Sequence, residues 1–117
     1  MAALADDWIT MGNHREAQVC IDVLCAYIRT PRNTTTSEDA VADTRVRETI
    51  TRVITQHLQD DAATSWSDKV FDFTEAHFTG SHSFDSAEFN EGCQVLFSGA
   101  EFNEGCQVDF FDAKFND

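Results

Sequence analysis

The stretch Ala87-Glu-Phe-Asn-Glu-Gly-Cys-Gln-Val95 recurs without change as Ala100-Glu-Phe-Asn-Glu-Gly-Cys-Gln-Val108, thirteen residues later. A nine-residue identity in a chain of 117 residues is typical of internal repetition. All ten phenylalanines lie in this half of the chain. Eight of them form four pairs spaced five residues apart: Phe73 and Phe78, Phe84 and Phe89, Phe97 and Phe102, Phe110 and Phe115. This rhythm predicts repeated structural units that each bury one aromatic ring.

A small or branched residue stands two positions before most of these rings. The six residues at this position are Ala76, Ala87, Val95, Ala100, Val108 and Ala113. Because side chains alternate between the two faces of an extended strand, each of them shares a face with the following phenylalanine. We therefore predict that these six residues and the eight paired phenylalanines form the core of the repeats.

The first half of the chain is predicted to be helical. Leu4, Trp8 and Met11 recur at helical spacing until Gly12-Asn13 interrupts them. Asn13, followed by Glu16, resembles a capping box that opens a second helix. On that helix one apolar face is predicted, with Val23 beside it, and it consists of Cys20, Leu24, Tyr27 and Ile28. Thr30-Pro31 ends the helix, because proline disfavours a helical residue before it.

Residues 32–43 are polar and are predicted to form a loop, and a third helix is predicted from about Asp43. Its apolar stripe consists of Val46, Ile50, Val53, Ile54, His57 and Leu58. We expect His57 to be a half-buried histidine with satisfied hydrogen bonds rather than a ligand. Trp66, in the linker after this helix, is predicted to pack across the junction of the two halves.

The net charge of −13 is unevenly distributed along the chain. From Val70 onward there are ten acidic residues against the single Lys114, a net charge of −9. A surface of this charge repels phosphate, so direct binding of nucleic acid by the second half is not expected. The charge fits a solvated surface, a surface that meets a basic partner, or a surface that imitates DNA.

The four cysteines are expected to be free thiols. Cys20 and Cys25 are predicted to be small core residues of the second helix. Cys93 and Cys106 occupy equivalent places in the repeat, and nothing in the sequence indicates a secretory context. Together with His77 and His82 they suggest a metal site, but no short C-x-x-C spacing supports one. We predict no metal and no cofactor.

The repeats resemble those of pentapeptide-repeat proteins. The resemblance rests on Ala76-His-Phe-Thr-Gly80, Ala100-Glu-Phe-Asn-Glu104 and Ala113-Lys-Phe-Asn-Asp117. In that family five residues form one side of a square, four sides form a coil, and the coils stack into a right-handed quadrilateral β-helix. The resemblance implies that the central phenylalanine and the residue two before it fill the interior.

The phenylalanine spacing then predicts about two coils. Phe73 should stack on Phe97, Phe78 on Phe102, Phe84 on Phe110, and Phe89 on Phe115. Gly92-Cys93-Gln94 and Gly105-Cys106-Gln107 would be three-residue insertions at corners. His82, where the pattern has alanine or valine, should mark a distorted side. The alternative is a β-meander with turns at Asn-Glu-Gly and Ser-Gly, because hairpins also fit this strand spacing.

The helical half is similar to the segment that precedes the repeats in a group of actinobacterial pentapeptide-repeat proteins. The similarity rests on Ala2–Trp8, Ala17–Arg29, Val46–Ile50 and Arg52–Leu58, together with Trp66. Relatives usually carry more chain upstream, including hydrophobic membrane segments, and often more coils downstream. The resemblance therefore implies a fragment or a truncated member of the group.

These observations predict an α+β protein. Residues 1–62 form a helical region of about three helices, residues 63–69 a linker, and residues 70–117 a short right-handed quadrilateral β-helix of about two coils. No signal peptide and no run of ~20 apolar residues is visible, so we expect a cytoplasmic chain without a membrane span. The full-length relatives would lie at the cytoplasmic face of the membrane.

Function is the least determined property. No catalytic constellation is visible, so we expect a non-enzymatic module for protein interaction or structure, whose partner the sequence does not identify. The alternative is an acidic DNA mimic that acts on a topoisomerase such as gyrase. A last coil without a cap leaves free backbone edges and exposes Phe110, Phe111 and Phe115. This predicts fraying or self-association through the carboxy-terminal end.

Overall fold

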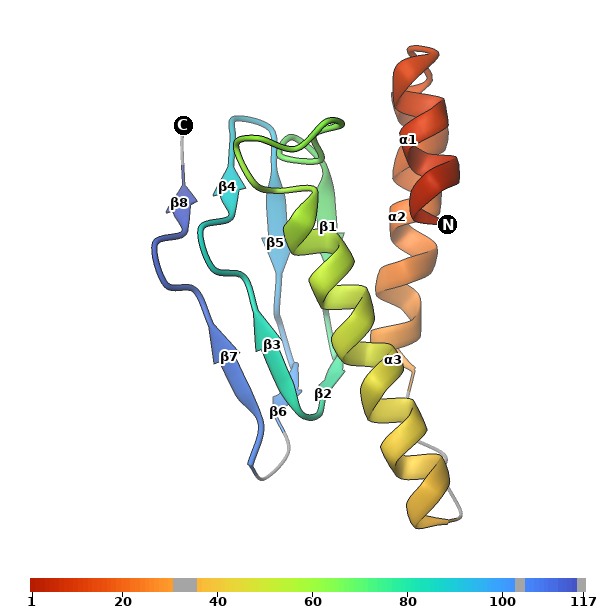
Figure 1. Ribbon diagram of the computed structural model, residues 1–117, viewed down its shortest axis with the longest axis vertical. Helices are drawn as coiled ribbons and strands as arrows, with labels where there is room; N and C mark the ends of the chain where they lie inside the picture. The colour runs from red at the N-terminus through yellow and green to blue at the C-terminus, as the bar shows by residue number, and fades with distance from the viewer. Residues whose placement is uncertain (31–35, 103–104, 116–117) are drawn as a thin grey trace.

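A computed structural model describes residues 1–30, 36–102 and 105–115 (Figure 1). Three α-helices come first: α1 (Ala2–Thr10), α2 (His14–Arg29) and α3 (Ser37–Gln56). Short strands follow: β1 (Val70–Asp72), β2 (His77–Phe78), β3 (Ser81–Ser83), β4 (Glu88–Phe89), β5 (Gln94–Leu96), β6 (Glu101–Phe102), β7 (Gln107–Asp109) and β8 (Lys114–Phe115). The prediction of an α+β protein with helices before strands is confirmed.

Each strand pairs in parallel with the strand four places later in the chain. The pairs are β1 with β5, β2 with β6, β3 with β7, and β4 with β8. We call β1–β4 the inner strands and β5–β8 the outer strands, because β1–β4 lie between the helices and β5–β8 (Figure 1). The β-meander is excluded for the described strands, since a meander joins antiparallel neighbours.

The expected three-residue insertions are wrong. Gly92 lies in a turn, Cys93 packs against the core, and Gln94 is the first residue of β5. Likewise Gln107 is the first residue of β7. Val70 pairs with Gln94, 24 residues later, whereas Ser81 pairs with Gln107, 26 residues later. The extra length therefore lies between β6 and β7, where Asn103 and Glu104 fall outside the described residues.

The four predicted ring pairs are confirmed. The ring centroids are 5.4 Å apart in Phe73–Phe97, 5.2 Å in Phe78–Phe102, 5.0 Å in Phe84–Phe110 and 4.8 Å in Phe89–Phe115. All four pairs are stacked, because parallel pairing in register places identical positions directly over one another. The inner ring of every pair is buried.

The helix boundaries agree with the sequence prediction except at the start of α3. α3 begins at Ser37, so the loop predicted over residues 32–43 is wrong from residue 37 onward, and residues 32–35 fall outside the described part. The Thr36 side chain accepts a hydrogen bond from the Asp39 backbone N–H and caps the helix. Glu38 and Asp39 in the first turn favour the positive end of the helix dipole. At α2, Asn13 is the N-cap residue but makes no side-chain capping bond.

The buried helix faces differ in part from the predicted ones. On α2 they include Ala17, Ile21 and Cys25 in addition to Cys20 and Ile28, while Val23 and Tyr27 are exposed. On α3, Ile50 and Ile54 are buried as predicted, but Val46 is exposed and its neighbour Arg47 is buried instead. Arg47 is buried because its guanidinium donates to backbone carbonyls at the end of α2 and in β2, which need donors.

Trp66 lies in the core cluster that contains residues of both halves. Its side chain is fully buried and stacks on His57, with ring centroids 3.9 Å apart. The Trp66 indole N–H donates to the Asp6 carboxylate over 2.9 Å. Helices and inner strands therefore share one continuous core.

Gly80, which connects β2 and β3, lies close to α3. A Cβ at this position would lie 2.5 Å from Glu48 Oε2 and 2.8 Å from Thr44 Cγ2, and the backbone has a φ of +84°. We expect Gly80→Ala to lower the free energy of unfolding by about 2–3 kcal/mol, because it adds backbone strain and displaces Glu48.

The matched control is Gly105→Ala. Gly105 has a similar φ of +79°, but a Cβ there meets none of the described residues within 4 Å. Denaturant unfolding of both variants separates the two effects, since only the contact with α3 differs. Equal losses would show that helix packing at Gly80 contributes nothing.

Candidate interaction surface

The helical side of the inner strands is closed by side chains that bond to strand backbone. On α2, the Gln18 amide donates to the Val70 carbonyl over 2.7 Å and accepts from the Val70 N–H over 2.9 Å. Arg29 donates to the Asp72 carbonyl and forms an ion pair of 2.9 Å with its carboxylate. The β1 backbone therefore has hydrogen-bond partners on α2, although none of the described strands pairs with β1 on that side.

α3 does the same for β2 and β3. Arg47 donates to the His77 carbonyl over 3.1 Å, and Glu48 accepts from the Ser81 N–H over 2.7 Å. The Thr55 hydroxyl donates to the Ser83 carbonyl over 2.7 Å. Unpaired strand edges are open to further pairing, so these contacts make this end of the molecule unreactive toward other strands.

The segment that follows α3 completes the closure at β4. The Glu88 N–H donates to the Leu58 carbonyl over 2.8 Å, and the Asn90 N–H donates to the Ser67 carbonyl over 2.9 Å. All four inner strands thus have partners on the helical side.

The far side of the outer strands has no comparable cover in the described part of the chain. Phe102 is 52% exposed and Phe115 is 68% exposed, although each stacks on a buried ring. Leu96, Phe110 and Phe111 are exposed as well. The predicted exposure of Phe110, Phe111 and Phe115 is confirmed. The outer strands therefore present unpaired backbone beside large apolar rings, which is a surface suited to interaction.

The predicted repeat core divides into an inner and an outer set. The buried members are Phe73, Ala76, Phe78, Phe84, Ala87 and Phe89. The partly buried members are Val95, Phe97, Ala100, Val108 and Ala113. The exposed members are Phe102, Phe110 and Phe115. Sequence reasoning missed Phe71, which is buried and pairs with Val95. Its position two residues before Phe73 was the available signal.

His82 takes the small-residue position in β3, and the expected distortion is wrong. It pairs in register with Val108, because α3 leaves space for the ring and supplies a partner. The Thr51 hydroxyl bonds to Nδ1 over 2.7 Å, and Nε2–H donates to the Thr79 carbonyl over 2.8 Å. Burial lowers the pKa of His82 below its ordinary value, although the Thr79 contact and the charge of Glu48 oppose this and that of Arg47 adds to it.

Because its pKa is lowered on folding, neutral His82 stabilises the folded state. The unfolded chain binds the proton more readily, so the contribution is complete above an unfolded pKa of about 6.5 and is lost as the pH falls toward the folded value. We expect the midpoint of urea unfolding to decrease more steeply in this window for the unmodified protein than for His82→Val. Parallel pH profiles would contradict the assignment.

His57 has partners at both ring nitrogens, as expected. Nδ1 bonds to the Val53 carbonyl over 2.8 Å and Nε2 to the Asp6 carboxylate over 2.8 Å. His57 therefore ties α1 to the end of α3 and is not poised toward a cavity.

The cysteines are free, and the structure does not bring the four residues of the metal hypothesis together. Burial raises the pKa of Cys93 to about 11, so its thiol stays protonated near neutral pH. His77 pairs with Glu101 over 3.1 Å, while His82 points into the core. Among the described residues no group of three His, Cys, Asp or Glu could hold a metal ion.

In the described part of the chain, no helix has the combination of length and apolar composition that crossing a bilayer requires. Comparisons with protein-family models, with curated proteins and with solved structures find no match to this chain.

Proposed function

We propose that the inner and outer strands are two coils of a right-handed quadrilateral β-helix, and that the chain is a relative of the actinobacterial pentapeptide-repeat proteins. Four parallel two-stranded sheets and four stacked ring pairs support this. So does the small residue that packs beside most of the rings.

We further propose that the protein is a non-enzymatic module for protein interaction. The observation that carries this proposal is the contrast between the two ends of the strand stack. The helical end is closed by specific side-chain contacts, while the outer strands keep an open edge beside Phe102 and Phe115. The strongest match for such an edge is another strand edge of the same kind, so we propose that a second copy binds there.

This binding is tested by sedimentation velocity over a range of protein concentration and salt. We expect association that strengthens with salt, because each copy carries a net charge of −13 and the repulsion is screened. Phe115→Lys should abolish it. Phe111→Lys is the matched control, since both rings are 68% exposed but only Phe115 belongs to a ring stack. A monomer under all conditions would overturn the proposal.

The second candidate is an acidic DNA mimic that acts on a topoisomerase such as gyrase. The observation in its favour is the charge of the repeat half, whose exposed carboxylates include Glu91, Glu101, Asp109 and Asp112. A supercoiling assay with gyrase distinguishes the two proposals. Inhibition at micromolar protein supports mimicry, and unchanged supercoiling excludes it.

A further inference from the structure

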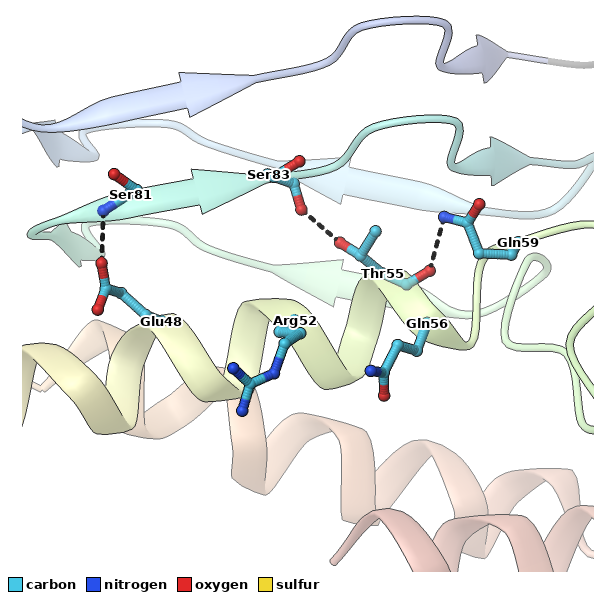
Figure 2. A pocket seen from close by; sticks show the side chains of 7 residues that line it. All are labelled: Glu48, Arg52, Thr55, Gln56, Gln59, Ser81 and Ser83. Atoms are coloured by element: carbon cyan, nitrogen blue, oxygen red, sulfur yellow. Dashed lines mark hydrogen bonds between the residues drawn. The ribbon is translucent and has the colours of Figure 1, made fainter.

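Figure 2 shows why a second copy cannot pair with the helical side of β3. The Glu48 carboxylate accepts from the Ser81 N–H, and the Thr55 hydroxyl donates to the Ser83 carbonyl, so α3 already occupies this side. The proposed self-association therefore uses the outer strands. Their arrangement and their charge restrict the orientation in which a second copy fits.

The outer strands form two longer and two shorter segments. β5 and β7 each have three residues, and β6 and β8 each have two. β6 lies at the lower end of the outer strands in Figure 1 and β8 at the upper end, and the segments with β5 and β7 run between these ends. Two copies that face each other through this one surface are related by a half-turn. Strands of equal length then meet in two ways: either β6 meets the partner's β8, or β6 meets β6 and β8 meets β8.

Glu101 and Lys114 distinguish these two orientations. Glu101 is the first residue of β6, Lys114 is the first residue of β8, and both side chains are exposed. If β6 meets β8, each copy places its Glu101 beside the partner's Lys114, which forms two ion pairs per dimer. If like strands meet, Glu101 faces Glu101 and Lys114 faces Lys114, and like charges directly opposite each other destabilise strand pairing.

Glu101 and Lys114 each lie opposite a complementary side chain of an inner strand. His77 Nδ1 is 3.1 Å from the Glu101 carboxylate, and Glu88 lies in register with Lys114. We infer, on the basis of the proposed self-association, that the second copy continues both ladders, with its Lys114 beside Glu101 and its Glu101 beside Lys114.

This orientation also gives each exposed ring of β6 and β8 a small neighbour. Facing strands are antiparallel, because a half-turn reverses the direction in which the chain passes around the outer strands. Positions on either side of an ion pair therefore oppose each other in reverse order, and they share the inward face. Phe102 then lies opposite the partner's Ala113, and Phe115 lies opposite the partner's Ala100. The register that forms the ion pairs thus covers both rings without a clash of two large side chains.

Charge reversal tests this orientation by sedimentation velocity at one fixed salt concentration. Glu101→Lys removes two negative charges from each copy, yet we expect it to weaken dimerisation by about tenfold or more, because both ion pairs become like-charge pairs. Lys114→Glu should also weaken it. The double variant Glu101→Lys/Lys114→Glu restores both pairs and the net charge of −13. Its affinity should return to within about threefold of that of the unmodified protein.

Recovery in the double variant cannot come from a contact within one copy, because β6 and β8 lie at opposite ends of the outer strands. Asp7→Lys is the matched control, since it makes the same change of net charge at an exposed position of α1. It should not weaken dimerisation.

Three outcomes would overturn this orientation while self-association stands. They are tighter association of Glu101→Lys, single variants that associate like the unmodified protein, and a double variant as weak as the single ones. An unmodified protein that stays monomeric would instead overturn the proposed function, and this inference with it.

Discussion

Phe78→Ala will lower the free energy of unfolding by about 3–5 kcal/mol, the usual cost of deleting a buried aromatic ring. Phe78 is fully buried and is surrounded by rings, with Phe73 at 5.5 Å, His82 at 5.0 Å and Phe102 at 5.2 Å between centroids. A cavity at this point would leave each of these three rings without a contact on one side, because the core is close-packed and few other groups can fill the space. Equilibrium unfolding in urea measures the loss.

Phe102→Ala is the control, because the same ring is removed one level further out in the same stack. Phe102 is 52% exposed, so its loss should cost on the order of 1 kcal/mol. If Phe78→Ala does not fold, Phe78→Leu, which keeps most of the volume, should still cost more than Phe102→Leu. Equal losses at the two positions would show that the inner rings do not form the core.

Arg47→Met will also lower the free energy of unfolding, by about 3–5 kcal/mol, because it removes one partner of a buried ion pair and leaves several acceptors unsatisfied. Arg47 is 1% exposed, and Nε donates to the Asp43 carboxylate over 2.8 Å. Its two terminal nitrogens donate to the carbonyls of Ile28 and Thr30, each over 2.7 Å, and to that of His77. One side chain therefore connects the end of α2, α3 and β2.

Arg45→Met on the same helix is the matched control. Arg45 is exposed, so the same change of charge and shape should alter stability by no more than about 0.5 kcal/mol. Thermal and urea unfolding of the two variants should therefore differ widely. A loss for Arg47→Met as small as that for Arg45→Met would contradict a connecting role for Arg47.

The repeat half could be predicted largely from its sequence, because the position of each ring follows from local spacing. Parallel pairing in register then determines which rings stack. The spacing therefore predicted correctly that Phe73 stacks on Phe97 and Phe89 on Phe115. The role of Phe71 was missed because a large ring occupies a position that is usually small. The sequence predicted a distorted strand at His82. The prediction failed because the buried imidazole is held by Thr51, which lies 31 residues away in the chain.

In the helical half, the burial of polar side chains could not be predicted from local sequence patterns. Arg47 is polar and sits beside an apolar stripe, so periodicity places it at the surface. Its burial depends on three carbonyls, at the end of α2 and in β2, and no local pattern reveals these. The same holds for Gln18, because its contacts depend on how a helix lies across strand backbone. The exposed rings of the outer strands, in contrast, follow from counting the repeats in the sequence.

The closed helical end limits what an assembly of this 117-residue chain can become. Head-to-tail stacking would require the outer strands of one molecule to meet an end where the helices and the segment after α3 already bond to the strand backbone. Only tail-to-tail contact joins two open edges, and it relates the copies by a two-fold axis. Such an isologous contact uses up both surfaces at once. Under the proposed self-association, growth would stop at the dimer, and a strand edge that could seed a fibre would form a closed pair instead.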